Sequence, residues 1–342
     1  MSAQLLNYRF SCAMKPSGLN IILAICCVEF FCLATITAAA QETGVFMKNP
    51  ADSRTMSLAG AGVVSLDDVS VLDNAALSPF SQNRFSAGFS CQSWMRNVLG
   101  GGMSSYSMSA RYSFSKAGTV YLGMRSLKTP PFEQTDDYGN VVDDTAKPGD
   151  MAFEMGYAHK FCGDFSAALT ARYLRLDPGY GNAANAVSFD AGLAWRHIFK
   201  GAMEDIAAIA QLKNFGTSPD YGSGRRSLPW LVNAGASAGL LAGKHNRFRA
   251  GAALDISVAP TCGSLSPSRG VSASFGAEYS YRRMVYARGG YHLGNKSAGE
   301  QRWASLGLGF RFWHMTLDAA LILTPSSSPL HDTASGTLSI WF

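Results

Sequence analysis

Charged side chains recur at alternate positions in several segments of this chain, and they are the residues that could do chemistry. Arginines and carboxylates gathered in one interior could form a charged conduit or a binding cavity, or they could pair with one another and only fill the space. We favour the paired network for any one of them. The candidates are Arg111, Glu154, Arg172, Asp190, Arg196, Arg249, Asp255, Glu278 and Arg288.

Support for enzymatic chemistry is weak. The six histidines are scattered, with no close pair and no zinc-ligand spacing. A Ser/His/Asp triad is assembled in space, so the spacing of residues in the sequence does not exclude it and that alternative stays open. The net charge of +5 is spread out, which does not favour nucleic-acid binding. We predict a non-enzymatic protein with no catalytic residue, no metal and no cofactor.

The elements that must position these charges show a strict two-residue rhythm. Tyr106, Met108 and Ala110 are apolar or aromatic, and Ser107 and Ser109 between them are polar. A strand places alternate side chains on opposite faces, so one face is suited to lipid and the other to water. Such blocks of about ten residues, separated by turn residues, are the signature of an outer-membrane β-barrel. The charges must then face the interior, since an Arg or Lys at the lipid midplane costs about 2–4 kcal/mol.

The whole chain gives an all-β, membrane-spanning antiparallel β-barrel of about 14 strands with a short N-terminal plug. A soluble β-sandwich also alternates, but the barrel better explains aromatic residues near strand ends, such as Tyr157, Trp195 and Trp313. The candidate strands are 85–91, 103–114, 120–124, 151–157, 165–173, 187–196, 206–214, 230–236, 248–256, 271–279, 284–291, 306–312, 315–321 and 338–342.

Three regions follow along the chain. Residues 1–40, with a possible start at Met14, have the charged start, apolar run and Ala-Ala-Ala ending of a secretory signal peptide; a membrane anchor is the alternative. Residues 41–82 are rich in small residues without alternation, and we expect a plug or periplasmic segment in or under the barrel. Residues 83–342 form the barrel itself. Its last outward set is an expected assembly signal: Leu338, Ile340 and Phe342.

Several motifs, taken together, resemble one known family. The segments 50–54, 58–63 and 74–77 look like the opening of the PorV/PorQ family, and the loop 135–140, the turn 213–216 and the hairpin 276–291 agree in order. Those proteins are outer-membrane barrels of Bacteroidota tied to the type IX secretion system, with the fourteen-strand architecture of fatty-acid-transporter barrels. The chain departs from the family at 73–75, Asp-Asn-Ala, where no proline occurs. The short length and the Asp-Tyr-Gly-Asn loop favour a divergent PorQ-like member.

The resemblance implies a non-enzymatic component of type IX secretion and surface attachment in the outer membrane, with secretion-complex proteins and lipid as partners. Its contact regions would be the loops 129–150 and 216–226, which we expect to face outside the cell. The alternative is a transporter of hydrophobic small molecules, which predicts an apolar pocket near the plug and a gap in the wall; a purely structural barrel is a third option. The loop candidates are Asp136, Asp137, Tyr138, Asn140, Tyr221 and Arg225.

Overall fold

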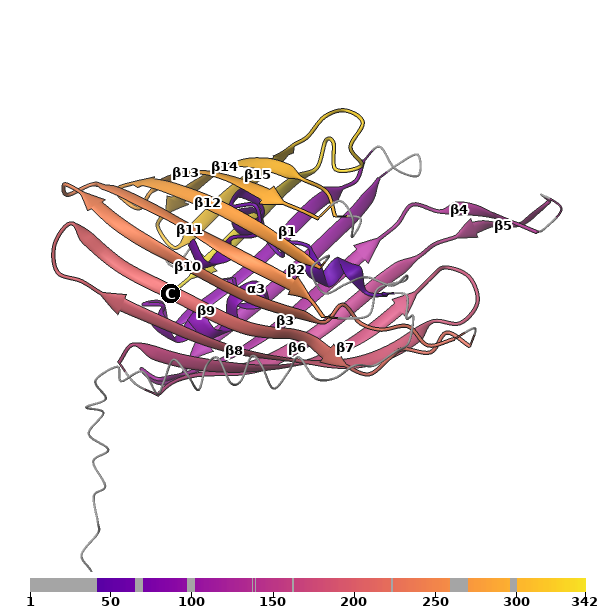
Figure 1. The fold of residues 1–342 in the computed structure, drawn as a ribbon, viewed down its shortest axis with the longest axis horizontal. Coiled ribbons are helices and arrows are strands. Elements are labelled where there is room, and N and C mark those ends of the chain that lie inside the picture. The colour runs from indigo at the N-terminus through magenta and orange to yellow at the C-terminus, as the bar shows by residue number, and fades with distance from the viewer. Residues whose placement is uncertain are drawn as a thin grey trace, which may run out of the picture. The chain divides into compact units, whose positions relative to one another are not determined.

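The computed structural model describes residues 42–64, 70–96, 102–136, 138, 140–161, 163–222, 224–258, 270–295 and 300–342. The predicted signal peptide and Asp137 lie outside these residues. Fourteen antiparallel strands form a closed barrel (Figure 1). They are β1 Phe85–Trp94, β2 Met103–Ser113, β3 Gly118–Lys128, β6 Gly149–Lys160, β7 Phe165–Asp177, β8 Ala184–Ile198, β9 Met203–Gly216, β10 Leu231–Ala242, β11 Asn246–Ser257, β12 Val271–Tyr281, β13 Val285–Leu293, β14 Trp303–Phe312, β15 Met315–Leu323 and β16 Ala334–Trp341.

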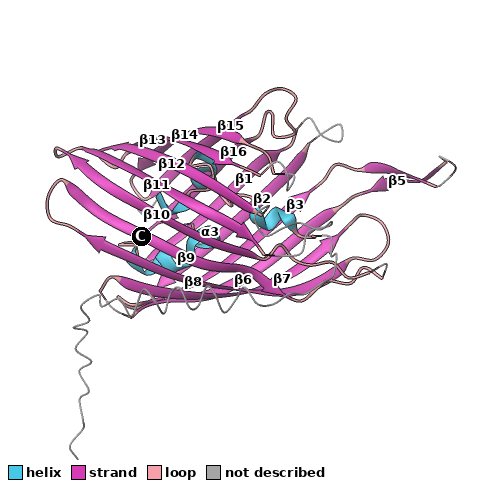
Figure 2. Cartoon of the chain, viewed as in Figure 1, coloured by secondary structure: helices cyan, strands magenta, loops and turns pink. Residues whose placement is uncertain are grey.

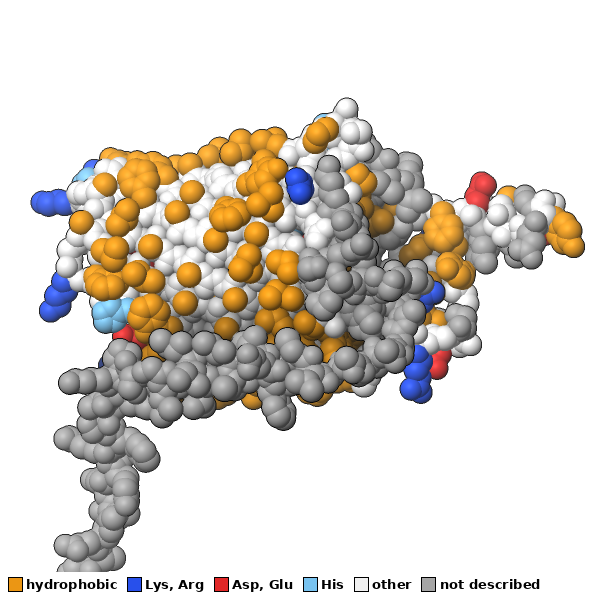
Figure 3. All heavy atoms as spheres, viewed as in Figure 1, with side chains coloured by type: hydrophobic (Ala, Val, Ile, Leu, Met, Phe, Trp, Pro, Cys, Tyr) orange, Lys and Arg blue, Asp and Glu red, His pale blue; other side chains and the backbone are white. Residues whose placement is uncertain are grey.

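Alternation of side chains separates the outside of this barrel from its inside. On β8, Val187, Phe189 and Leu193 are exposed, whereas Ser188, between the first two, and Ala194, after Leu193, are buried. Apolar side chains accordingly spread over the outer wall (Figure 3). Each of the fourteen predicted strands overlaps one strand of the barrel, so the prediction of the fold class and of the strand number is confirmed.

The two ends of the barrel have different connections. The barrel closes where β1 pairs with β16, from Ser86 opposite Trp341 to Ser93 opposite Ala334. Turns of two to four residues join the strands at the end where the chain stops, and connections of six or more join them at the other. In outer-membrane barrels short turns face the periplasm and longer loops face the outside of the cell. We call these ends the short-turn end and the long-loop end.

A chain of short helices lies inside the barrel and forms the plug (Figure 2). The Asp52 carboxylate caps the α-helix α2 by accepting the Thr55 N–H at 2.7 Å. The plug starts at the long-loop end, where the Thr43 N–H donates to the Ser227 carbonyl, and it ends beside the start of β7, where the Ser166 hydroxyl donates to the Ala76 carbonyl. Its elements are η1 Val45–Lys48, α2 Ser53–Ser57, η2 Gly62–Val64, α3 Val71–Asn74 and η3 Ala75–Phe80.

No helix among the described residues is long and apolar enough to cross a membrane.

The expectation of one long polar loop over residues 129–150 is wrong in part. It contains a hairpin, β4 Phe132–Thr135 paired with β5 Val141–Ala146, which projects from the long-loop end (Figure 1). Its strands are short and their register is irregular. The apolar residues are too few and too unevenly placed to show the alternation by which the longer strands are recognised.

Candidate functional site in the plugged lumen

The predicted interior charges all lie on inward positions, where they form ion pairs or hydrogen bonds. Arg172 joins the carboxylates of Glu154 at 2.5 Å and Asp190 at 2.7 Å, and it also donates to the Asn214 amide oxygen at 2.8 Å. Because each carboxylate here faces a guanidinium, the group avoids the large penalty of an unpaired buried charge. Their arrangement joins β6, β7, β8 and β9 across the inner wall.

The other six predicted charges complete this pattern near the ends and on the far wall. Arg196 and Arg249 share the Asp205 carboxylate, at 2.6 and 2.5 Å. Arg288 pairs with Glu278 at 2.6 Å. The remaining two form hydrogen bonds: Arg111 donates to the Ser81 hydroxyl at 2.5 Å and to the Asn83 carbonyl at 3.2 Å, and Asp255 accepts from the Asn233 amide at 2.6 Å.

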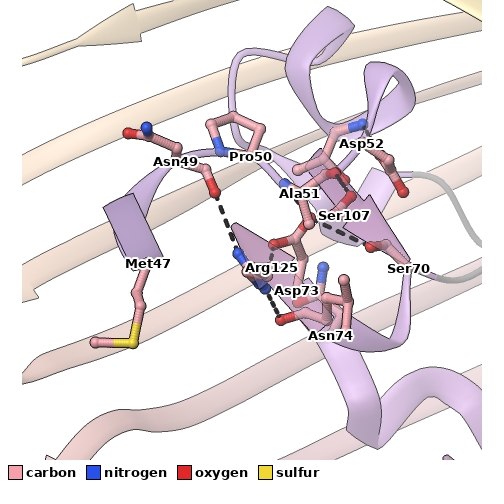
Figure 4. Close-up of polar contacts among 12 residues, drawn as sticks. Met47, Asn49, Pro50, Ala51, Asp52, Ser70, Asp73, Asn74, Ser107 and Arg125 are labelled. Atoms are coloured by element: carbon pink, nitrogen blue, oxygen red, sulfur yellow. Dashed lines mark hydrogen bonds and ion pairs between the residues drawn. The ribbon is translucent and has the colours of Figure 1, made fainter. Parts of the chain in front are cut away.

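Arg125 of β3 clamps the plug to the wall, and sequence analysis missed it. Its guanidinium contacts the carboxylate of Asp73 at 3.2 Å and the carbonyl of Asn49 at 3.3 Å, and it also donates to the Leu72 carbonyl (Figure 4). One side chain therefore holds two separate stretches of the plug. Its signal in the sequence was its inward parity on β3, shared with the buried Tyr121.

Asp73 is the plug residue whose carboxylate pairs with Arg125. Besides Arg125, its carboxylate accepts the Ala51 N–H at 3.1 Å and the Ser70 hydroxyl at 3.3 Å, so it ties the start of the plug to its later turn (Figure 4). Burial and the neighbouring Asp73 charge raise the pKa of Asp52 above its ordinary value of 3.8. Asp52 and Asp73 thus differ, because Asp73 has an arginine partner and Asp52 mainly caps a helix.

A second ionic contact joins the plug to another part of the wall, four strands from β3. Arg54 of α2 lies 3.3 Å from the Asp318 carboxylate of β15, which also receives Arg288 at 2.7 Å. Asp318 therefore links the Arg288–Glu278 pair to the plug. Together with Arg125, this contact anchors the plug by charge at two places on the barrel.

Packing fixes the plug elsewhere. Residues 57–59, at the end of α2 and just after it, approach β12, β13 and β14 closely, at the inward glycines Gly276, Gly290 and Gly307. A Cβ on Gly290 would lie 2.5 Å from the Leu58 carbonyl carbon, closer than two such atoms can come. Against β1, β2 and β16, in contrast, a cavity of about 40 Å³ remains, lined by hydroxyl groups that include Ser90, Ser109 and Thr337.

An apolar group interrupts the polar interior at the long-loop end. Phe46 and Met47 of η1 pack against Leu174 and Leu176 of β7 and against Leu228, all of them buried. We call these five residues the mouth cluster. The two leucines of β7 occupy inward positions that elsewhere on the strand hold Ser166, Thr170 and Arg172. That run of inward leucines was the available signal, and the prediction of a charged interior passed over it.

The predicted loop residues divide between two places. Tyr221 faces the plug: its hydroxyl lies 2.6 Å from the Thr43 hydroxyl, and burial raises its pKa. Arg225 is exposed and 3.7 Å from Asp220. In the β4–β5 hairpin the Asp136 carboxylate accepts the N–H groups of Tyr138 and Asn140. The loop candidates therefore do not form one surface.

The predicted assembly residues lie on the outer wall. Leu338 and Ile340 alternate with the buried Thr337 and with Ser339 along β16, and the ring of Phe342 is exposed beyond the strand. In the part of the chain that the structure describes, no group of three or more His, Cys, Asp or Glu side chains could hold a metal ion.

A closed barrel with an apolar exterior, a charged and paired interior and an inserted N-terminal plug is the architecture of a plugged outer-membrane barrel. No family model and no curated protein matches the chain. Among solved structures, the toluene transporter TodX of P. putida is similar with a TM-score of 0.54 and 11% identity, over 86% of this chain and 99% of that one. A TodX deletion mutant, described as a monoaromatic hydrocarbon channel, has a TM-score of 0.51 and 12% identity, over 84% and 96%. These similarities concern the fold.

Proposed function

We propose that this protein is an outer-membrane channel for small hydrophobic molecules, held closed by its own plug. The mouth cluster carries the proposal: it is a buried apolar group at the long-loop end of the barrel, and removing the chain's own Phe46 and Met47 from it would leave an apolar chamber. The fold shared with a toluene transporter supports this choice over a purely structural barrel. The cavities in the closed form, about 40 and 10 Å³, are too small for a hydrocarbon ring.

Displacement of the plug's first turn would create the missing space. Phe46 and Met47 lie on η1, a single turn whose start is held by the Thr43 contacts with Ser227 and Tyr221. Their burial stabilises this position by about 1.5–3 kcal/mol per side chain, which an apolar ligand taking their place would replace. An engineered apolar cavity of about 150 Å³ binds benzene, so a space of that order suffices.

The test is uptake of radiolabelled toluene by cells that carry the protein in their outer membrane. We expect uptake above that of cells with the empty vector, and severalfold faster uptake with F46A/M47A, because the chamber is then vacant. The matched control is Phe153→Ala, which truncates an outward ring on the neighbouring strand β6, and it should leave uptake unchanged. Equal uptake by all strains, vector included, would overturn the proposal.

A second candidate, a component of type IX secretion, follows from the resemblance to the PorV/PorQ family and from the β4–β5 hairpin. In this hairpin the Asp136 carboxylate accepts the N–H groups of Tyr138 and Asn140, and Tyr138 has 92% of its surface exposed. Exposed aromatic side chains are suited to contact another protein. Replacing residues 132–146 by a Gly-Ser linker should abolish cross-linking to secretion partners and leave toluene uptake intact. Unchanged cross-linking would remove this candidate.

A further inference from the structure

Several turns at the short-turn end carry cations. They contain Lys116, Lys200, Lys244 and the pair Arg282 and Arg283, all exposed. The turns of Lys200, Lys244 and Arg282 follow one another at intervals of two strands, roughly 10 Å around the rim, and Lys116 lies four strands from Lys200. Basic and histidine side chains are visible at this end, opposite the β4–β5 hairpin (Figure 3). We call Lys116, Lys200, Lys244 and Arg282 the basic rim.

The carboxylates that could neutralise the basic rim are already occupied. Asp164 lies 2.6 Å from the His197 ring nitrogen, and Glu204 pairs with Arg247, Arg249 and Arg283. Within the described residues, none of the four cations of the basic rim forms an ion pair. Four like charges without partners repel one another, so an anionic partner at this surface would stabilise them.

The long-loop end lacks this imbalance. There Arg225 has Asp220 beside it, and Lys48 pairs with Glu42 at 3.0 Å. The β4–β5 hairpin and its flanks are acidic in sequence, with Glu133 and Asp136 against Lys147. The difference in charge between the two ends is therefore built into the connections and is not a property of the whole surface.

Aromatic rings place the basic rim at a membrane surface. Exposed rings lie in the turns at this end and at the strand ends beside them, among them Phe114, Tyr157, Phe161, Tyr281 and Trp313. Rings of this kind lie at the level where hydrocarbon gives way to lipid headgroups. One rim cation contacts such a ring: the Arg282 guanidinium lies 5.5 Å from the centre of the Tyr281 ring. Cations at headgroup depth meet lipid phosphates before they meet any soluble protein.

We propose that the basic rim binds anionic phospholipid headgroups of the periplasmic leaflet and so selects the lipids that surround the barrel. The chemistry is that of a lysine or arginine facing a phosphate at the edge of the hydrocarbon, as in basic segments beside anionic membranes. This inference concerns lipid contact and is independent of the channel proposal, since it involves neither the plug nor the mouth cluster.

The experiment measures quenching of tryptophan fluorescence by brominated lipid in reconstituted bilayers. Trp313, 76% exposed in the turn after β14, reports on this leaflet. The purified protein is placed in phosphatidylcholine with increasing brominated phosphatidylglycerol, and the reciprocal series with brominated phosphatidylcholine gives the relative binding constant. We expect the wild type to prefer the anionic lipid about fivefold or more, the effect of roughly one cation near a charged surface. The preference should weaken between about 0.1 and 1 M salt.

Two matched variants locate the effect. K116Q/K200Q/K244Q/R282Q removes the basic rim and should bring the relative binding constant close to one. R96Q/K128Q/K147Q/R225Q removes as many exposed cations from the long-loop end and should retain the preference. Heat-modifiable migration in electrophoresis shows that each variant is a folded barrel.

Three results would overturn the proposal: no preference in the wild type, a preference that survives loss of the basic rim, or equal loss in both variants. The first result would favour an acidic periplasmic protein as the partner of the basic rim. The second would mean that other residues select the lipid. The third would mean that the lipid preference depends only on the total charge of the protein.

Discussion

The plug meets the barrel wall in two contrasting ways. Along β12–β14 the contact is by packing, with glycines at the wall and the backbone of residues 57–59 pressed against them. Along β1, β2 and β16 the contact is polar and loose, with hydroxyl groups around a cavity of about 40 Å³. On the wall of β7–β9 the gap beside the plug is about 10 Å³. We call the first the packed side and the second the polar seam.

The two kinds of contact have different effects on the plug: packing fixes its position, and the polar contact lets it move. A packed contact has one geometry, because any shift creates an overlap or a void. Hydroxyl groups around a cavity can exchange partners: the Ser53 hydroxyl already lies 2.8 Å from both Ser335 and Thr337. The packed side therefore fixes where the plug sits, and the wall restrains the plug least along the polar seam.

The largest expected effect tests what holds the plug beside the polar seam. Arg125→Met removes the clamp from β3 and leaves the Asp73 carboxylate buried without its arginine. Breaking such a pair costs about 3–5 kcal/mol. We expect a lower melting temperature and faster hydrogen exchange in residues 49–56 and 70–80, whereas residues 57–59 on the packed side stay protected.

The control for Arg125→Met is the double variant that also replaces Asp73 by Asn. In R125M/D73N neither partner keeps a buried charge, so part of the stability should return. Uniform loss of protection over the whole plug would mean that the packed side cannot hold it alone, and the proposed division of roles would then be wrong.

The sequence predicted the wall of this barrel far better than its plug contacts. A barrel strand faces lipid on one side and the interior on the other. Along a strand such as 187–196, the type of each side chain indicates which side it faces. A plug contact depends on which wall residue lies opposite, which no periodicity encodes. Gly290 resembles any glycine of a barrel strand until Leu58 is seen against it. Arg125 and Asp73 are 52 positions apart and meet only in the fold.

Leu174 and Leu176 show a different limit of prediction from the sequence. The alternation of their strand is intact, so its register was predictable, but inward leucines violate the rule that the interior is polar. Such exceptions are informative because an interior without lipid contact has no need of leucine unless something apolar lies against it. Here the structure supplies Phe46 and Met47.

The second expected effect compares one added methyl group on each side. Gly290→Ala on the packed side must displace the backbone at Leu58 and Ala59, and overpacking of this kind costs about 1–3 kcal/mol. Gly88→Ala faces the polar seam, where the nearest atom is the Ser339 hydroxyl at 3.2 Å, which can rotate away. Thermal unfolding should show a lower melting temperature for the first variant and little change for the second. Equal shifts would contradict the contrast between the two sides.

The smallest effect concerns Asp52, which lines the polar seam. Asp52→Asn keeps the helix cap and removes the cost of burying a charge, so stability at neutral pH should be unchanged or slightly higher. Asp52→Ala loses the cap, at a cost of about 1 kcal/mol. Because burial raises the folded-state pKa of Asp52 above 3.8, the folded protein binds a proton where the unfolded chain does not.

The sign of the pH dependence follows from this. As the pH falls through the raised pKa toward 3.8, wild-type stability should rise relative to Asp52→Asn, and the difference should fade once both states are protonated. Melting temperatures of the two proteins, measured as a difference at each pH, cancel the titration of the other carboxylates. A difference that stays constant with pH would mean that Asp52 carries no buried charge. The mobility of the polar seam would then depend on its hydroxyl groups and not on Asp52.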